Sequence, residues 1–376
     1  MEQSTRLPLR LPRVTVIGLL LLAACGGGGG GDSGAGGGGA TNIPRYAFVA
    51  NESDNSVSSY VVDADTGRLK YIGKAAAGSQ PRSVSVDPSG KYAYVANYGN
   101  DSVSQYTIGA SGGLTPIAPA TTSAQAGPVS LAMTRGSAPV QAVPKYAYVA
   151  NIDGDSVSQY TIGASGGLEA MVPATVAAGT GPRSVSVDPS GKYAYVANLN
   201  NNVSQYTIGA GGGLTAMVPA TVAAGANPIS VIVDPSGKYA YVANNSGNVS
   251  QYTIGAGGGL APMTPATVAA GSPTSVSVDP SGKYAYVANF GGNVSQYTIG
   301  ASGGLTAMAP PTVAAGTLPH SVSVDPSGKY AYVANTNGGT VSQYTIDASG
   351  GLTPMGTPTV AAGTGPFSVT TTGTWQ

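Results

Sequence analysis

A hexapeptide that returns at nearly constant spacing constrains the fold of this chain more than any other feature. Its seven copies, six reading YAYVAN and the first YAFVAN, start at Tyr46, Tyr92, Tyr146, Tyr193, Tyr239, Tyr284 and Tyr330. Successive copies are 46, 54, 47, 46, 45 and 46 residues apart. A period in the forties that carries several short strands is typical of a β-propeller or of a tandem array. The strands within one unit and the two ends of the chain distinguish these folds.

Each unit contains four predicted strands. In the second unit, residues 83 to 87, 92 to 97 and 103 to 108 alternate between two kinds of side chain, and a fourth strand follows Leu114. Asp87-Pro88-Ser89-Gly90 has the residue order of a type I turn, and Ala110-Ser111-Gly112-Gly113 supplies the positive-φ residues of a hairpin. Four antiparallel strands joined by short turns make one propeller blade.

The ends of the chain favour a closed ring over a straight solenoid. The first unit starts on a second strand, at Pro44-Arg45-Tyr46, and the chain finishes with a first strand at residues 366 to 371. Pairing these two segments completes a seventh blade and removes the exposed edges of the sheet. A solenoid needs polar caps at both ends, and none is visible. We therefore predict an all-β, seven-bladed propeller over residues 43 to 376.

The first 42 residues have the pattern of an exported protein. Residues 1 to 25 combine a basic start with the apolar segment Val14 to Leu22, which is short for a membrane span. The segment ends in Leu22-Ala23-Ala24-Cys25, which resembles the lipobox of bacterial lipoproteins, so Cys25 is the expected site of lipidation and of membrane attachment. An ordinary signal cleaved near Ala24 is the alternative.

Residues 26 to 42 are Gly-rich and predict a flexible tether. Gly26 stands where an aspartate favours retention in the inner membrane, so the lipoprotein pattern points to the outer membrane, with the side of the membrane left open. The expected location is the cell envelope.

Composition restricts the partners and cofactors. The formal net charge is zero, which gives no electrostatic reason to expect nucleic acid. One histidine and one cysteine exclude a transition-metal cluster of usual composition. Asp153-Gly154-Asp155 and Asp63-Ala64-Asp65 could contribute oxygen ligands to calcium, but both lie where turns favour Asp and Gly. We expect a monomer without a metal or another cofactor.

Most remaining charges and aromatic residues have a structural interpretation. The aspartates that open the DPSG turns and the lysines that follow them, such as Asp188 and Lys192, are interpreted as solvated turn pairs. The tyrosines, including Tyr71 and Tyr98, are assigned to the core. Residues 134 to 144 replace one DPSG turn and are interpreted as an insertion in a surface loop, where added length costs little stability.

The repeat resembles a known family. VDPSGKYAYVAN, followed by VSQYTI, GGL, AAG and a proline, is similar to the repeats of the seven-bladed propeller family that includes bacterial 6-phosphogluconolactonase-like proteins and the YVTN surface-protein repeats. The resemblance covers nearly all of residues 44 to 376. It implies the propeller fold, and activity must be argued from the site because propellers have many functions.

Sequence variety gathers on one rim of the predicted ring. The loops after the second strands differ from unit to unit, as do the residues after the proline that opens each first strand: Arg82, Val129, Arg183, Ile229, Thr274, His320 and Phe367. These seven residues are expected around the mouth of the central channel. The lactonase-like resemblance implies ligand binding by Arg82 and Arg183 and activation of water by His320 or Glu52.

Two functions follow from this rim. Near-identical blades supply few different groups for one active site, so the residues favour a cell-envelope lipoprotein that binds a small ligand, a glycan or a protein through its variable loops. The alternative is a lactone hydrolase of the 6-phosphogluconolactonase-like type, with its site at the channel mouth. The two differ in whether Arg82, Arg183, His320 and Glu52 lie within the span of one ligand.

Overall fold

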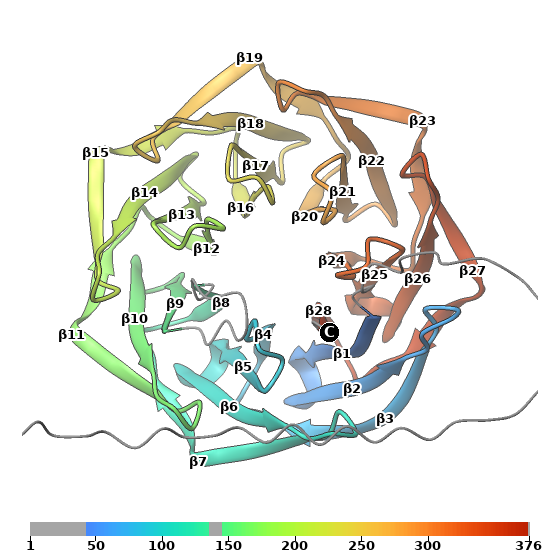
Figure 1. The fold of residues 1–376 in the computed structure, drawn as a ribbon, viewed down its shortest axis with the longest axis horizontal. Coiled ribbons are helices and arrows are strands. Elements are labelled where there is room, and N and C mark those ends of the chain that lie inside the picture. Colours follow the sequence, from blue (N-terminus) through green and yellow to red (C-terminus); the bar gives the residue numbers. More distant parts are fainter. Residues whose placement is uncertain (1–42, 135–144, 375–376) are drawn as a thin grey trace, which may run out of the picture. The chain divides into compact units, whose positions relative to one another are not determined.

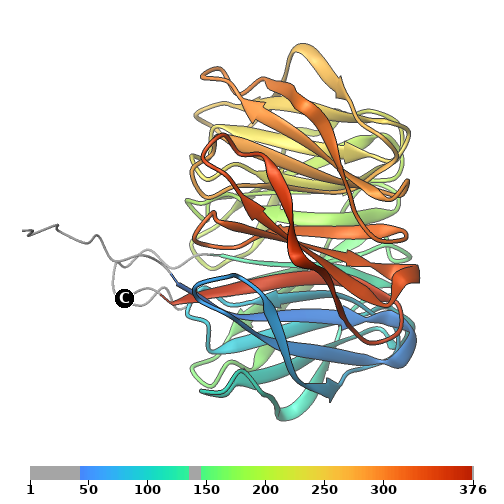
Figure 2. The same ribbon diagram turned by 90° about the vertical axis from the view of Figure 1, so that its right-hand side faces the viewer.

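The computed structural model describes residues 43–134 and 145–374, which form a ring of seven four-stranded antiparallel sheets. Figure 1 shows the blades arranged around a common central axis, and Figure 2 shows the same ring turned by 90°. The predicted fold, an all-β propeller with four strands per blade, is confirmed. The predicted signal and tether, Cys25, and residues 135–144 of the predicted insertion lie outside the described residues, so those assignments stay predictions.

Every blade has the same strand order, from the channel to the outside. The first strands line the channel: β28 (Pro366–Thr374), β4 (Pro81–Val86), β8 (Pro128–Met133), β12 (Pro182–Val187), β16 (Pro228–Val233), β20 (Pro273–Val278) and β24 (Pro319–Val324). The second strands are β1 (Ile43–Asn51), β5 (Tyr92–Asn97), β9 (Tyr146–Asn151), β13 (Tyr193–Asn198), β17 (Tyr239–Asn244), β21 (Tyr284–Asn289) and β25 (Tyr330–Asn335). The third strands are β2 (Ser56–Val62), β6 (Ser102–Ile108), β10 (Ser156–Ile162), β14 (Asn202–Ile208), β18 (Asn248–Ile254), β22 (Asn293–Ile299) and β26 (Thr340–Ile346). The outer strands are β3 (Leu69–Ala76), β7 (Leu114–Ser123), β11 (Leu168–Ala177), β15 (Leu214–Ala223), β19 (Leu260–Ala269), β23 (Leu305–Ala314) and β27 (Leu352–Ala361).

We number the blades in chain order, with blade 1 formed by β28, β1, β2 and β3 and blade 7 by β24 to β27. Short 3₁₀ helices follow the second strands of blades 1, 2 and 7: η1 (Glu52–Asp54), η2 (Tyr98–Asn100) and η3 (Thr336–Gly338).

The last strand closes the ring as the sequence predicts. β28 pairs antiparallel with β1, with Thr371 opposite Ala47 and Pro366 opposite Asn51. Val369 is buried in the core cluster between blades 7 and 1. One sheet therefore contains both ends of the described chain, and blade 1 exists only when they meet.

The cores lie between neighbouring blades and are bridged by tyrosines. In blade 2, the fully buried Tyr94 donates its hydroxyl to the Gly166 carbonyl of blade 3 at 2.7 Å, and Tyr106 donates to the Ala76 carbonyl of blade 1 at 2.6 Å. The equivalent bond from Tyr332 to the Gly67 carbonyl joins blade 7 to blade 1. Each of these tyrosine side chains thus buries a large apolar area while its hydroxyl keeps a hydrogen-bond partner.

The turn aspartates are buried, so their interpretation as solvated turn pairs is wrong. Asp188 is 5% exposed and accepts backbone N–H bonds from Ser190, Lys192 and Tyr193 at 3.0, 2.8 and 2.8 Å. None of the ion pairs among the described residues includes an aspartate of a DPSG turn. The carboxylate closes the turn onto the next strand.

A threonine replaces this aspartate in the two blades that lack it. The Thr134 hydroxyl accepts a bond from the Tyr146 N–H at 3.3 Å, and the Thr372 hydroxyl accepts one from the Tyr46 N–H at 3.1 Å. The position therefore requires an acceptor oxygen and tolerates the loss of the charge.

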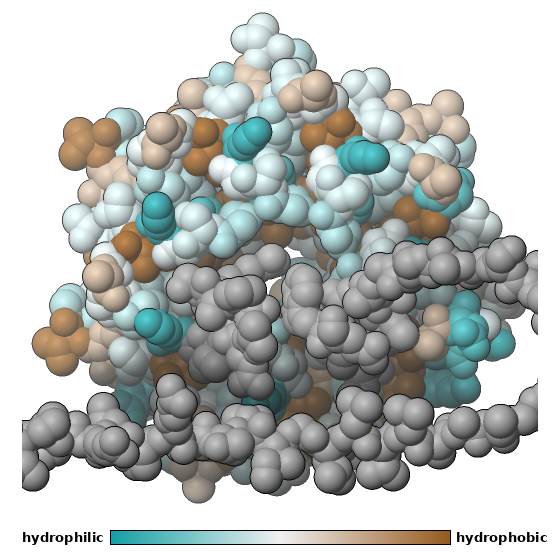
Figure 3. Space-filling view, in the orientation of Figure 1, coloured by the Kyte–Doolittle hydropathy of each residue, from teal (hydrophilic) through white to brown (hydrophobic). Residues whose placement is uncertain are grey.

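Two tyrosines depart from the assignment of all tyrosines to the core. Tyr71 is 53% exposed on β3, and Tyr98 lies in η2 beside the guanidinium of Arg82. Figure 3 shows one face, which outside the area under the grey atoms is mostly pale, with small and separate hydrophobic and hydrophilic spots. The visible part of this face has no extended hydrophobic patch.

The pairing of first and second strands shows which face of the propeller carries the channel mouth and which face carries the ends of the described chain. Their opening prolines and the last residues of the second strands lie at one face, where Pro366 faces Asn51. Ile43 faces Thr374 at the other end of the same pair of strands. A site at the prolines therefore opens on the face opposite to both ends of the described propeller.

Candidate functional site

The candidate site is built from one irregularity that all blades share. In blade 4, Pro182 pairs with Asn198 and Ser184 with Ala197, so Arg183 is left out of the ladder. The first strand of each other blade has the same bulge after its proline. A β-bulge bends the strand and turns the side chain of the extra residue. The bulged residues are Arg82, Val129, Arg183, Ile229, Thr274, His320 and Phe367.

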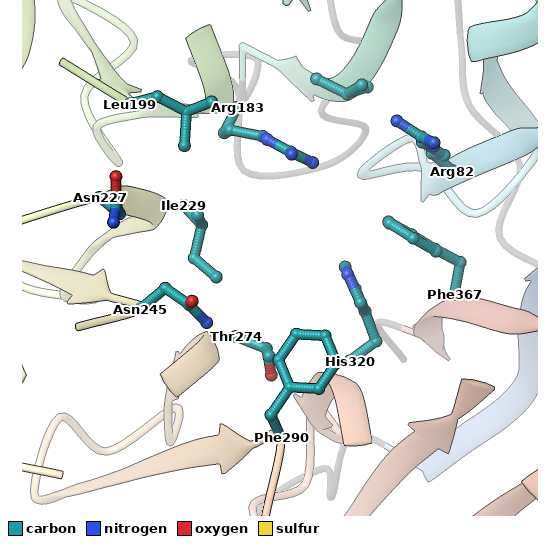
Figure 4. A pocket seen from close by; sticks show the side chains of 11 residues that line it. Arg82, Arg183, Leu199, Asn227, Ile229, Asn245, Thr274, Phe290, His320 and Phe367 are labelled. Carbon is teal, nitrogen blue, oxygen red and sulfur yellow. The ribbon is translucent and has the colours of Figure 1, made fainter. Parts of the chain in front are cut away.

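All seven bulged residues line one pocket of about 310 Å³, as expected from their position after the prolines. Leu199, Asn245 and Phe290, which follow the second strands of blades 4, 5 and 6, complete the wall together with Asn227. Figure 4 shows these side chains directed toward a common space. The volume lies at the lower end of the range for small-molecule sites.

Arg82 is held in place by groups from two blades. Its Nε donates to Glu52 Oε1 at 2.8 Å, and both side chains are less than one-fifth exposed. Its guanidinium carbon lies 3.6 Å from the centre of the Tyr98 ring and 5.4 Å from that of Phe367. A charge-assisted hydrogen bond and stacking on an aromatic face fix the guanidinium.

Arg183 has a different environment. Its Nε is buried and has no hydrogen-bond partner, and it belongs to none of the ion pairs among the described residues. Burial and the positive charge of Arg82 lower the pKa of Arg183, while Tyr98, Asp153 and Glu52 act in the opposite direction. Figure 4 shows the side chain extending from the wall toward His320 and Arg82. Arg183 therefore lines the pocket with a guanidinium whose buried Nε has no partner.

His320 is neutral near pH 7. Burial, followed by the positive charges of Arg183 and Arg82, lowers the pKa of its imidazole to about 3, and a hydrogen bond with the Phe367 backbone opposes this shift. Its ring lies 3.5 Å from the Phe367 ring, centre to centre, with a tilt of 35°, and 6.3 Å from Phe290 in an edge arrangement. The half-buried ring is thus positioned by aromatic contacts on two sides.

The structure brings together three of the four predicted site residues. Arg82, Arg183 and His320 line the pocket, whereas Glu52 lies behind Arg82 and outside the residues that form the wall. The ligand-binding role of the arginines and the catalytic roles of His320 and Glu52 stay predictions. The pairing of Glu52 with Arg82 favours a role in positioning that arginine.

Sequence reasoning did not single out Phe290, Leu199, Asn227, Asn245 or Tyr98. Phe290 carried a usable signal, because the chain has only three phenylalanines, and two of them flank its single histidine in this pocket. For Tyr98 no such signal existed, since the sequence is rich in tyrosine and only the fold places this ring under Arg82.

No group of three or more His, Cys, Asp and Glu side chains within residues 43–134 and 145–374 is arranged to hold a metal ion. Asp155 accepts a bond from the Gly181 N–H at 2.8 Å, and Asp63 accepts bonds from Thr66 and pairs with Lys70. Both act as turn residues. The same part of the chain has no helix with the length and hydropathy required to cross a membrane.

Comparison with known families agrees with this architecture. The family described as lactonase, 7-bladed beta-propeller, matches the chain over residues 43–244 and 215–367. No curated protein matches the chain significantly.

Solved structures with a similar fold match this chain over almost their whole length. A candidate 6-phosphogluconolactonase of Bacteroides fragilis is 21% identical with a TM-score of 0.76, and the match covers 89% of this chain and 99% of that one. The periplasmic gluconolactonase of Pseudomonas aeruginosa is 20% identical with a TM-score of 0.72, over 87% of this chain and 98% of that one. At these identities the likeness establishes the fold.

Proposed function

The chain belongs to the family of lactonases with a seven-bladed β-propeller, and on that premise we propose that its mouth pocket binds and hydrolyses a lactone. One observation carries this proposal: Arg183, a cationic residue outside every ion pair of the described residues, and the neutral imidazole of His320 line the same small pocket. A donor and a neutral base are the two groups that acyl transfer to water requires.

In the proposed reaction, the oxygen of water bonds to the lactone carbonyl carbon while Arg183 donates to the carbonyl oxygen. Negative charge grows on that oxygen, and a positioned cationic donor stabilises it. His320 accepts the proton of water and passes it to the ring oxygen when the acyl–oxygen bond breaks, which yields a hydroxy acid. Arg82, held by Glu52, adds positive charge to the same space.

The low pKa of His320 makes the free imidazole a weak base. Negative charge that develops beside Arg183 offsets the field that depresses this pKa, so the imidazole gains basicity as water attacks. The proton transfer and the charge on the carbonyl oxygen are therefore coupled through Arg183.

The test is hydrolysis of a panel of sugar and acyl lactones by the purified full-length chain. We expect Arg183→Gln and His320→Ala to lower kcat/KM at least about 100-fold, as for loss of an oxyanion donor or a general base. Lys192→Gln removes one positive charge from the same blade, in a turn at the other face, and is the matched control. Hydrolysis that survives both pocket substitutions unchanged contradicts the mechanism.

Ligand binding without hydrolysis is the second candidate. It is favoured by the pairing of Glu52 with Arg82, which leaves no free carboxylate in the pocket wall to act as a base. A pocket that binds the hydroxy acid while lactones decay only at their uncatalysed rate identifies this function.

A further inference from the structure

We propose that the mouth pocket selects an amphiphilic acid or its lactone, with an apolar acyl or aryl body and a single oxygen-rich head, over a polyhydroxylated sugar. This inference rests on the proposed function for the lactone, and for the acid it rests on the pocket alone. It follows from how apolar groups, hydrogen-bonding groups and charges are distributed around the pocket.

Apolar side chains form one part of the wall. Ile229, Leu199 and Phe290 project into the pocket away from the side that carries Arg82, and Phe367 faces the His320 ring (Figure 4). Phe290 is 40% exposed, which is unusual for a large apolar side chain in this chain. A ligand that covers these groups removes apolar surface from water, and each Å² removed contributes roughly 25 cal/mol.

The neutral polar groups of the wall are largely engaged within the protein. Thr274 is 4% exposed, and its hydroxyl lies 3.0 Å from the carbonyl oxygens of both Ala288 and Pro319. Asn245 Nδ2 donates to the Pro273 carbonyl, and Asn227 Nδ2 donates to the Ser246 hydroxyl, both at 3.2 Å. The Thr274 hydroxyl and one N–H of each amide are therefore already used before a ligand arrives.

The neutral acceptors of the wall include the amide oxygens of Asn227 and Asn245, but charged acceptors for sugar hydroxyls are missing. None of the residues that line the pocket is an aspartate or glutamate, and the nearby Glu52 carboxylate is bound to Arg82. A polyol that enters this pocket gives up hydrogen bonds to water and meets no carboxylate that could replace them, and each hydroxyl that stays unpaired costs about 1–3 kcal/mol. An acyl or aryl body has no such groups to satisfy.

The charges specify the head of the ligand. The wall contains two arginines, and the one carboxylate that pairs with them serves Arg82. The buried Nε of Arg183 lacks an acceptor, and the neutral His320 imidazole adds no negative charge. A carboxylate, or the polarised carbonyl of a lactone, gives the guanidinium of Arg183 a partner of opposite or partial negative charge.

The experiment compares four soluble probes on the purified full-length chain by ligand-observed NMR and calorimetry. Phenylacetate has the apolar body and the carboxylate, phenylacetamide has the body alone, gluconate has a carboxylate on a polyol, and glucose has neither. We expect phenylacetate to bind at least tenfold more tightly than the other three. Arg183→Gln should remove the preference for phenylacetate over phenylacetamide, and Phe290→Ala should weaken phenylacetate several-fold while leaving gluconate unchanged.

Gluconate affinity equal to or above that of phenylacetate overturns the inference, as does a failure of all four probes to bind or an unchanged phenylacetate affinity in Arg183→Gln. This design distinguishes a failure of the proposed hydrolysis from a failure of the proposed selectivity. Phenylacetate binding without lactone hydrolysis overturns the proposed catalysis and supports the selectivity, whereas faster hydrolysis of sugar lactones than of acyl lactones supports catalysis and overturns the selectivity.

Discussion

At the scale of single residues, the pocket gives its two arginines opposite conditions. Arg82 has an anionic partner in Glu52 and an aromatic surface in Tyr98, so its charge is compensated before any ligand binds. Arg183 has a buried Nε without a partner and repels Arg82 through the pocket. The same residue type, two blades apart, thus serves as a fixed structural charge in one place and as an open donor in the other.

The protonation of His320 follows from these charges and can be measured directly. As the only histidine in the chain, it gives one imidazole signal in NMR spectra when the purification tag lacks histidine. We expect it to stay neutral through pH 5 and to titrate near pH 3, because burial, and after it the positive charges of Arg183 and Arg82, disfavour the imidazolium. Arg183→Gln should raise this pKa in part, because burial and Arg82 still hold it below 6.5. A wild-type midpoint near 6.5 contradicts the described environment.

The same shift has a consequence for stability. Between about pH 6.5 and pH 3 the unfolded chain binds a proton on this histidine that the folded protein does not bind, so the free energy of unfolding falls as pH decreases through that window. Above about pH 6.5 neither state binds this proton, so the histidine no longer lowers the free energy of unfolding. His320→Gln should therefore lose less stability on acidification than the wild type, which is checked by urea unfolding at pH 7 and pH 5.

At the scale of elements, a glutamine joins each third strand of blades 2 to 7 to the following blade. In blade 4, Gln205 Oε1 accepts the Leu260 N–H of blade 5 at 2.6 Å, while its Nε2 donates to the Pro219 carbonyl at 3.1 Å. Blade 1 has Ser59 at this position, and a second pocket of about 140 Å³ lies beside it, next to Leu114. The junction between blades 1 and 2 therefore lacks one of the contacts that repeat around the ring.

Restoring the glutamine should strengthen this junction. We expect Ser59→Gln to raise the free energy of unfolding by about 1 kcal/mol, the usual net value of one added hydrogen bond. The reverse change, Gln205→Ser, should lower it by about 1–3 kcal/mol because a buried N–H loses its partner. Urea denaturation measures both. A loss of stability in Ser59→Gln shows that the side chain does not reach Leu114.

Another feature at this scale concerns the free edges of the blades. Every outer strand from β7 to β27 contains at least one proline, and β3, LKYIGKAA, contains none. Proline on an edge strand prevents pairing with a second molecule. In β3 the exposed Lys70 and Lys74 occupy the edge instead, where charged side chains have the same effect.

At the scale of the whole molecule, stability depends on the meeting of the two ends. Deleting residues 365 to 376 removes β28, leaves β1 without a partner on the channel side, and exposes the cluster that buries Val369. We expect the single melting transition to disappear or to move down by roughly 10 °C or more. A chain shortened only by residues 375 and 376 retains the whole strand and is the control. An unchanged transition, followed by circular dichroism, contradicts closure by β28.

The sequence by itself determined the architecture, because the information for it is local and repeated. Turn residues such as Asp87 to Gly90 mark the strands, the period counts the blades, and the missing and surplus strands at the two ends predict closure. It also placed Arg82, Arg183 and His320 near the channel mouth, since residues after equivalent prolines must lie at equivalent places in a ring.

Only the tertiary structure decided what these residues face. The bulge that turns each of them into the channel, the pairing of Glu52 with Arg82, the stacking of Tyr98 and the neutral state of His320 depend on contacts between different strands and blades. Arg82 and His320 are far apart in sequence and act on each other through one pocket. Residue type and spacing do not predict such long-range neighbours, and these neighbours determine the burial and the protonation of each pocket residue.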